Sequence, residues 1–426
     1  MAELYGITSV IKPSVSEAPV TIGTELVFIG TSNTSSHLYE PVKCTSRDDI
    51  QVKYGAYEKG SFEKIARYAF DKLHLDHLWL ININDGTVPA ATFTENSITA
   101  DNVKNGVDAL DDIYMHHGAV PSLVVLPYNQ MHGATPGDVA DYAAGKCRNL
   151  NGLFKAQVVI DNTVNYSSLE ENMRGETSLN SYTIPDADIG KDCSDGNCIL
   201  CIGNIRVTPN PNSFDIPMSI VVACNRAYQD AMNPASVPCR SVGNLDCRGA
   251  VDYTITYTNV SGSSRSFSTV PLMMSKSEAD SLTEFGFIVA RNKGMNRYIT
   301  WGDHTAAVEA GDTGDELNRF DSNVAMAYHL ANRWILKWEH TIDRPMTLAL
   351  RNDIINEEQT YLNYLVAVGA LVGNPKCEFR PVDNTSDSIG QGQFYFTNTY
   401  TNAIPTKYLQ LNLVWTSEGL ASYLEG

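Results

Sequence analysis

The sequence has no apolar run of about 18 residues, the length that a helix needs to cross a bilayer. Its start, Met1 to Gly6, has neither a basic region nor an apolar core, so we recognise no secretory signal. We therefore expect no membrane insertion, and assembly in a reducing cytoplasm. Hydrophobic residues still make up 43% of the 426 residues, which is enough for roughly two or three packed domains.

Basic residues are scarce. The chain has 31 Lys and Arg against 49 Asp and Glu, which gives a formal net charge of −18 at pH 7. Nonspecific binding to nucleic acid depends on Lys and Arg that neutralise phosphates. We therefore expect no direct contact between this protein and nucleic acid.

Cysteines are few for this length, and their number is odd. Nine cysteines lack the density of a small disulfide framework, and at least one must stay unpaired within the chain. Cys193, Cys198 and Cys201 lie closest together, but a zinc site usually has two close pairs and only Cys198 and Cys201 form one. The Ile-Leu between them favours a strand, so we interpret these cysteines as buried thiols. Disulfides formed after release from the cell, and a metal site, are the alternatives.

The chain also lacks a recognisable catalytic motif. Gly390-Gln391-Gly392 has neither the Lys nor the helix of a phosphate-binding loop. Asp85 and His132 give an acid and a base in the order of some serine hydrolases, but no serine follows in a small-residue turn that opens a helix. We predict no catalytic residue, no cofactor and no metal ion.

From residue 23 to about residue 235, short apolar segments alternate with segments of helical spacing. Apolar strands separated by helices predict an α/β fold with a mostly parallel sheet covered by flanking helices. We expect Ile199–Ile205 and Ile220–Cys224 to join this sheet. The predicted strands before them are Leu26–Gly30, His77–Ile83, Ser122–Leu126 and Ala156–Ile160, and the predicted helices are Ser61–Leu73, Val103–Met115 and Asp138–Arg148.

Two stretches interrupt this alternation. Thr163–Gly196 is rich in Asn, Ser, Glu and Asp and has no sustained period. Cys247–Val270 alternates in a hairpin-like way around Asn259–Ser264. We interpret 163–196 and 247–270 as exposed insertions.

The C-terminal part of the chain predicts two amphipathic helices followed by three strands. The first helix should begin after Asp321 or Ser322, whose side chains can cap its first turn. The second should begin near Asn352–Asp353 and end at Gly373, because glycine takes the left-handed cap and Pro375 cannot continue a helix. The predicted strands are Cys377–Val382, Gln393–Tyr400 and Lys407–Trp415.

The order of these segments is the most informative feature of the sequence. The first helix has an arginine near its middle, Arg333, and a linking segment with Pro345 leads to a helix that ends in Gly369–Gly373. Upstream lie Glu284–Val289 and Ile299–Thr305, and downstream lie Asn384-Thr385, Asp387, Gly390 and Pro405. This order resembles that of the tail sheath proteins of contractile phages and phage-tail-like injection systems. Asp303-His304 departs from the small residue and arginine that many relatives carry there.

The resemblance implies an α/β domain that is often described as subtilisin-like, joined to an α+β assembly domain and extended terminal arms. On this basis we expect an N-terminal linking arm at residues 1–22 and an α/β sheath domain at 23–305. The C-terminal α+β assembly domain would span 306–415, and 416–426 would be a tail.

The resemblance also implies a structural role. The subunit would polymerise helically around an inner tube and contract, driving the tube through the envelope of a target cell. Expected partners are other copies in stacked hexameric rings, the tube protein, and baseplate and tail-terminator proteins. The expected location is the virion tail, after assembly in the host bacterial cytoplasm. The alternatives are an α/β hydrolase and another structural protein of the tail or baseplate.

Both ends of the chain are strand-prone, and the N-terminal segment has no local partner strand. The N-terminal residues concerned are Leu4, Tyr5, Ile7, Val10 and Ile11. Near the other end, Leu409, Leu411, Leu413 and Trp415 alternate with other residues, which predicts a strand with one buried face. In relatives such arms complete the sheets of neighbouring subunits, and we expect the same here; an arm folded onto its own domain is the alternative.

Overall fold

The computed structural model describes residues 23–93, 97–127, 136–162, 191–208, 214–233, 235–261, 264–271, 276–295, 297–308 and 315–417. The predicted N-terminal arm and most of the insertion at 163–196 lie outside these ranges. None of the described helices is long and apolar enough to span a membrane.

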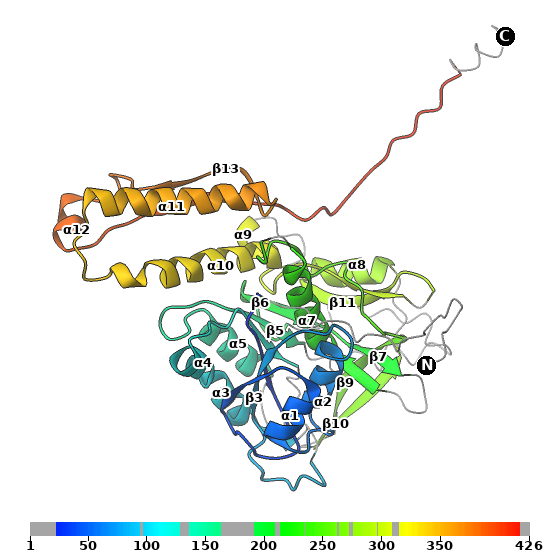
Figure 1. Cartoon of the computed structure of the whole chain (residues 1–426). Coiled ribbons are helices and arrows are strands. Elements are labelled where there is room, and N and C mark those ends of the chain that lie inside the picture. Colours follow the sequence, from blue (N-terminus) through cyan, green and yellow to red (C-terminus); the bar gives the residue numbers. More distant parts are fainter. Residues whose placement is uncertain are drawn as a thin grey trace, which may run out of the picture.

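An eight-stranded sheet forms the centre of the larger part of the molecule (Figure 1). Its order is β12-β11-β6-β5-β4-β1-β3-β2, and the strands from β11 to β3 are parallel to one another, whereas β2 and β12 pair antiparallel at the two edges. The strands are β1 (Leu26–Gly30), β2 (Pro41–Cys44), β3 (Leu78–Asn82), β4 (Leu123–Leu126), β5 (Gln157–Asp161), β6 (Cys198–Cys201), β11 (Phe287–Asn292) and β12 (Tyr298–Trp301). The predicted α/β fold with a mostly parallel sheet is confirmed.

Helices cover this sheet, and every residue of β1, β3, β4 and β6 is buried. Helix α7 packs on β4, β5 and β6 with α2 beside it, while α3 and α5 pack against each other over β1 and β5. Local caps start the helices: Ser46 accepts a hydrogen bond from the Asp49 N–H in α1, and Thr99 forms a capping box with Asn102 in α3. The helices are α1 (Arg47–Tyr54), α2 (Ser61–Ala69), α3 (Ala100–Asp108), α4 (Leu110–His117), α5 (Pro136–Cys147), α7 (Met218–Ala231) and α8 (Lys276–Glu284).

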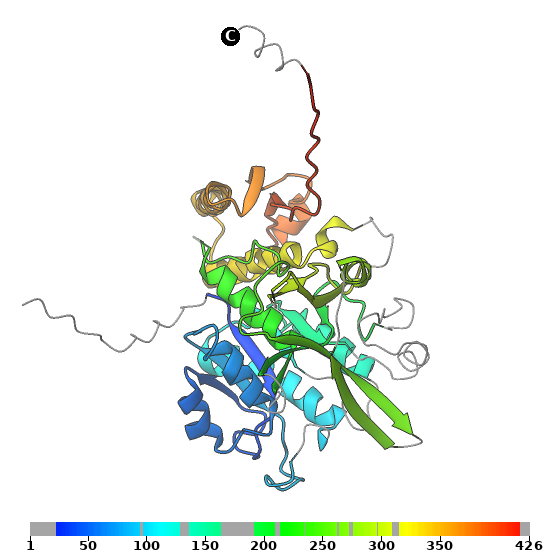
Figure 2. The same cartoon turned by 90° about the vertical axis from the view of Figure 1, so that its right-hand side faces the viewer.

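A second sheet of four strands has the order β10-β9-β7-β8. Its hairpin pairs Ser261 of β9 with Ser264 of β10 and projects from the body in Figure 2. The hairpin predicted within 247–270 is therefore confirmed. The strands are β7 (Asn204–Thr208), β8 (Phe214–Pro217), β9 (Asp252–Ser261) and β10 (Ser264–Pro271).

The C-terminal part forms a smaller unit, in which α10 lies between the α/β body and α11 (Figure 1). Strands β13 and β14 form an antiparallel pair, and β13 packs on α11. A separate apolar core joins these elements: Val237, Met326, Leu330, Leu362, Leu365, Ala370, Leu371 and Cys377. The elements are α9 (Glu316–Arg319), α10 (Asp321–Trp338), the 3-10 turn Glu339–Thr341, α11 (Leu348–Ala367), β13 (Leu371–Glu378), α12 (Ser386–Gly390) and β14 (Thr397–Asn402).

Several predicted boundaries in this unit are wrong. Helix α10 includes Asp321 instead of being capped by it, and α11 begins at Leu348, where Thr347 accepts a hydrogen bond from the Leu350 N–H. Gly369 already takes a left-handed conformation, at φ 76°, so the chain leaves the helix before Gly373. Gly373 instead lies in β13, within a register irregularity between Val372 and Lys376.

The predicted strand Ile220–Cys224 is also wrong, because these residues lie in α7. That helix is buried on nearly all sides, and a short apolar run in such a helix has the same pattern as a buried strand. The predicted strand Ile199–Ile205 is divided between β6 of the large sheet and β7 of the second sheet, with Gly203 at φ 82° between them. The strands predicted at Cys377–Val382 and Gln393–Tyr400 are displaced to β13 and β14.

The segment from Lys407 to Trp415 forms no strand within this single chain, and its expected pairing with a neighbouring subunit remains a prediction. It runs away from the body as an extended segment (Figure 1), and both of its faces are exposed. The reason is that no strand of the described chain lies beside it. The domain boundaries at residues 22, 305 and 415 remain predictions.

Candidate assembly site

The two long helices of the C-terminal unit are joined through a buried carboxylate. Glu358 of α11 is 2% exposed. Nη1 of Arg333 in α10 donates to both of its oxygens at 2.8 Å, and Nε1 of Trp338 donates to Oε1 at 2.8 Å. The Arg333 guanidinium also lies over the Tyr361 ring, 3.7 Å from its centroid. These contacts hold α10 and α11 in one fixed arrangement.

A second buried charge cluster joins α10 to the α/β body. Arg226 of α7 donates to Asp321 at the start of α10 at 2.5 Å and to Asp230 at 3.2 Å. Burial raises the pKa of Asp321 to about 7 and that of Asp230 to about 6, while Arg226 acts in the opposite direction. Two carboxylates thus share one guanidinium in a site that excludes water.

Neutral hydrogen bonds continue this junction along α10. Asn332 accepts from the Lys155 N–H at 2.9 Å and donates to the Lys155 carbonyl at 2.7 Å. Gln157 of β5 donates to the Asp321 carbonyl at 2.9 Å. Helix α10 is therefore fixed to the body over much of its length.

A cleft of 580 Å³ lies along the side of α10 that faces the body. Its lining includes the basic side chains Lys155, Arg333 and Lys337. Gly23, the first described residue of the chain, lines it as well.

His329 of α10 also lines this cleft. Burial lowers its pKa to about 4, and the nearby Arg333 contributes to the shift. Its Nε2 lies 2.7 Å from the hydroxyl of Tyr361 in α11. The hydrogen bond between the imidazole and the Tyr361 hydroxyl adds a third link between α10 and α11.

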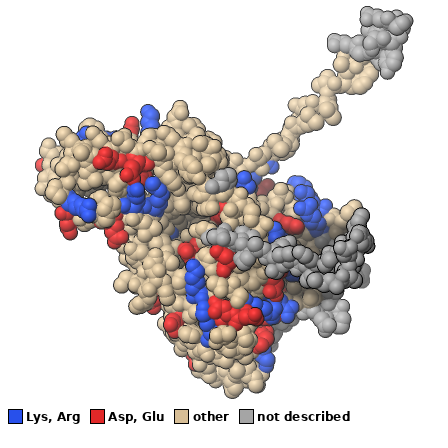
Figure 3. Space-filling model, in the orientation of Figure 1, with Lys and Arg blue, Asp and Glu red and all other residues tan. Residues whose placement is uncertain are grey.

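The surface of the C-terminal unit carries charges of both signs. Figure 3 shows acidic and basic side chains next to one another on this unit. One such pair is Lys337 with Glu357, at 2.6 Å, where both side chains are about half exposed. Exposed pairs of this kind contribute little to stability, so they are available for contacts with another surface.

The C-terminal segment presents an apolar surface to solvent. The predicted site residues Leu409, Leu411, Leu413 and Trp415 are 87%, 80%, 85% and 81% exposed. A run of large exposed apolar side chains is typical of an interaction surface. The predicted site residues of the N-terminal arm, Leu4, Tyr5, Ile7, Val10 and Ile11, lie outside the described residues.

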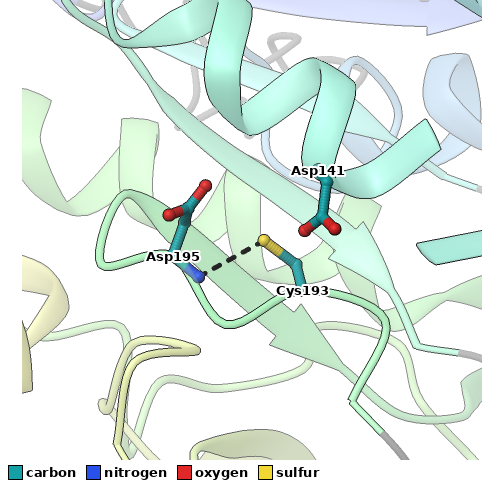
Figure 4. Close-up of side chains that lie close together, drawn as sticks. All are labelled: Asp141, Cys193 and Asp195. Carbon is teal, nitrogen blue, oxygen red and sulfur yellow. Dashed lines mark hydrogen bonds between the residues drawn. The ribbon is translucent and has the colours of Figure 1, made fainter. Parts of the chain in front are cut away.

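Cys198 and Cys201 lie in a strand, as predicted, whereas Cys193 precedes that strand. Cys198 and Cys201 are fully buried in β6, and burial raises the pKa of both thiols. All nine cysteines are free thiols. Cys193, Asp141 and Asp195 lie side by side, with their potential ligand atoms within 4.8 Å of one another (Figure 4).

Asp195 and Cys193 of this cluster have protein partners. Arg148 donates to Asp195 at 2.8 Å, and the Cys193 sulfur accepts from the Asp195 N–H at 3.4 Å. Asp141 is exposed to water. A metal ion is therefore not required to explain the arrangement, and the absence of zinc at Cys193, Cys198 and Cys201 remains a prediction.

Asp85, the acid of the hydrolase alternative, stabilises a turn. It accepts hydrogen bonds from the Thr87 N–H at 2.9 Å and from the Asn102 side chain at 3.1 Å, and these bonds lower its pKa. The candidate base, His132, lies outside the described residues.

The junction residues Arg226, Asp230 and Asp321 were not predicted from the sequence. Arg226 and Asp230 are one helical turn apart and follow the apolar run 220–224, which is a usable signal for a buried ion pair. The partner Asp321 is distant in sequence and had no such signal. Glu358 was likewise indistinguishable from its exposed neighbour Glu357.

No protein-family model matches the sequence, and comparison with curated proteins gives no match. Solved structures do match over nearly the whole chain. A chain of the anti-feeding prophage baseplate has 14% identity and a TM-score of 0.63, covering 98% of this chain and 100% of its own. The helical sheath of the anti-feeding prophage in its contracted state has 14% identity and a TM-score of 0.60, with the same coverage.

A sheath tail protein from Listeria innocua has 10% identity and a TM-score of 0.54, covering 91% of this chain and 96% of its own. Identities this low establish a shared fold. The protein has the fold of contractile sheath proteins.

Proposed function

We propose that this protein is a structural subunit of a contractile sheath, which polymerises helically around an inner tube and contracts to drive that tube through a target cell envelope. The observation that carries the proposal is the similarity to the contracted helical sheath of the anti-feeding prophage. That similarity includes the α/β body, the C-terminal unit and their connection, because it covers 98% of this chain and all of the other.

The C-terminal unit supplies the links between subunits. Within the described residues its sheet has two strands, β13 and β14, so each strand has an edge that can accept another. A two-stranded sheet is marginal alone and gains from added strands. The exposed 409–415 segment of one neighbour and the 4–11 segment of another are the strands that we assign to these edges.

Strand addition suits a polymer that must move without coming apart. Each main-chain hydrogen bond contributes about 1 kcal/mol, and side-chain pockets add specificity. Linked arms would let the bodies rotate as rigid units and form larger interfaces in the contracted state. The free energy released when these larger interfaces form would supply the work of contraction.

The finer assignments follow from the same role. The α/β body would be the subtilisin-like sheath domain, and the partners would be further copies in stacked hexameric rings, the tube protein, and baseplate and tail-terminator proteins. The sheath would belong to a phage tail, where contraction accompanies genome ejection, or to a related injection system, and would assemble in the bacterial cytoplasm.

Negative-stain electron microscopy of the purified full-length chain tests the proposal. We expect striated tubes of uniform diameter with a hollow centre. A protein that stays monomeric, or forms only featureless aggregates over a range of concentrations and salts, would count against a sheath subunit.

A further inference from the structure

Asp303 is a buried carboxylate that follows strand β12, and the residue is 4% exposed. Nζ of Lys407 donates a hydrogen bond to its Oδ1. Lys407 comes from the far end of the chain, immediately before the exposed C-terminal segment. A buried carboxylate is costly without a positive partner. The contact therefore stabilises the Asp303 carboxylate and holds the Lys407 side chain in place.

The neighbouring histidine does not replace Lys407 as that partner. His304 Nε2 lies 3.8 Å from the Asp303 carboxylate and has no hydrogen-bond partner. Its Nδ1 lies 2.8 Å from the Thr283 carbonyl and therefore carries the proton. Burial and then Lys407 lower the pKa of His304, so the imidazole is neutral.

Lys407 also contacts the start of α10. Its ammonium lies 5.5 Å from the centroid of the Phe320 ring, which is buried and precedes the helix. The Asp303 carbonyl accepts a hydrogen bond from the Asp321 N–H at 3.0 Å. Lys407 is thus held where the chain passes from the α/β body into the C-terminal unit.

The chain just before Lys407 is fixed at a second point. The Ala403 N–H donates to the Ala370 carbonyl at 3.4 Å, and the Asn402 side chain donates to the Asn323 carbonyl at 3.4 Å. Beyond Lys407, Tyr408 is already 77% exposed. The segment between Ala403 and Lys407 therefore crosses from the C-terminal unit to the body and then leaves both.

We propose that Lys407, through Asp303, is a positioning residue for the C-terminal linking segment, and that it fixes the place and direction in which this segment leaves the subunit. The eight residues from Tyr408 to Trp415 span at most about 29 Å. Fixing the point where the C-terminal segment leaves the subunit therefore limits which surface of a second copy this segment can reach. Without the contact the free segment would begin near Ala403, and its effective concentration at that surface would fall.

The anchoring is a property of the single chain, whereas its consequence for assembly rests on the proposed function.

The test uses the unassembled protein and limited chymotrypsin digestion, with mass spectrometry to measure cleavage after Tyr408 and after Trp415. Trp415 serves as an internal reference, because it is already exposed and distant from the anchor. The variants are Lys407→Gln, Asp303→Asn, the two together, Lys407→Arg, and the exposed control Lys293→Gln.

We expect cleavage after Tyr408 to become about threefold to fivefold faster in Lys407→Gln and in Asp303→Asn, a modest change because Lys407 is half exposed. The double variant should cleave no faster than either single variant. Lys407→Arg and Lys293→Gln should match the wild type, and cleavage after Trp415 should not change.

The proposed role of Lys407 would be contradicted if cleavage after Tyr408 stays unchanged in both single variants while circular dichroism shows an intact fold. Equally faster cleavage after Tyr408 and after Trp415 would also contradict it, because a general loss of structure would then explain the faster cleavage. Electron microscopy of the same variants is scored separately. A confirmed anchor in a wild-type chain that never forms tubes would reject the sheath proposal and leave the anchor intact.

Discussion

Arg226 of α7 donates a hydrogen bond to Asp321 of α10 across 2.5 Å, and both side chains are buried. The two residues belong to different parts of the molecule, so the bond fixes the first turn of the C-terminal unit against the α/β body. Such a rigid junction suits the proposed sheath function, in which the subunit would rotate as one body.

Substitution of Arg226 tests the strength of this junction. Arg226→Met should lower the free energy of unfolding by about 3–5 kcal/mol, because Asp230 and Asp321 would lose their shared positive partner. Denaturant unfolding measures the change. The triple variant Arg226→Met, Asp230→Asn, Asp321→Asn should regain most of the loss. A single variant within about 1 kcal/mol of the wild type would mean that the cluster does not hold the junction.

Two adjacent glutamates provide a matched pair in α11. Glu358→Ala should destabilise the C-terminal unit by about 2–4 kcal/mol, since it leaves Arg333 and Trp338 without their buried acceptor. Glu357→Ala removes only an exposed pair with Lys337 and should cost less than about 1 kcal/mol. Hydrogen exchange of α10 and α11 reports the local effect. Similar exchange in the two variants would contradict the assigned difference.

His329 should make stability depend on pH. Its pKa is about 4 in the folded chain and about 6.5 when unfolded, so between these values the unfolded chain binds more protons. Its contribution is therefore present above pH 6.5 and is lost as the pH falls towards 4. The raised pKa values of Asp230 and Asp321 act in the opposite direction over an overlapping range.

Comparison with His329→Gln isolates the histidine, because both proteins share the aspartates. Between about pH 7.5 and about pH 5, the wild type should lose up to about 2 kcal/mol more stability than the variant. Urea unfolding at the two pH values gives the difference. Parallel pH dependences would show that His329 titrates normally in the folded chain.

The cysteines near residue 193 should bind no metal. Cys198 and Cys201 are buried in a strand, and Asp195 is already paired with Arg148. Elemental analysis of protein purified without chelators should find far less than one zinc per chain. A stoichiometric ion that is lost on Cys193→Ser substitution would reverse this interpretation.

Much of the fold could be predicted because its signals are local. The strand Leu26–Gly30 is fully buried and apolar, and its predicted bounds match β1. The failures have physical causes. Helix α7 is buried on nearly all sides and residues 220–224 are all apolar, so periodicity could not separate helix from strand over them. The second helix was misplaced because Gly369 and Gly373 are both suitable ends and the earlier one is used.

The charged contacts of the candidate site could not be predicted in the same way. Asp303 and Lys407, like Arg226 and Asp321, are far apart in sequence and meet only in the folded chain. The apolar alternation at 409–415 was recognised, but its predicted burial is absent from the single chain. We propose that its partner strand belongs to another copy of the chain, so the pairing does not form within a single copy.

Deletion of residues 2–12, studied beside the full-length chain, tests the central claim most directly. Thermal unfolding measures folding, and electron microscopy measures assembly. We predict that the full-length chain forms ordered tubes, and that the deletion variant folds with a similar melting temperature yet forms none. Ordered tubes from the deletion variant, or its failure to fold, would show that this segment belongs to its own core and would contradict the linkage between subunits.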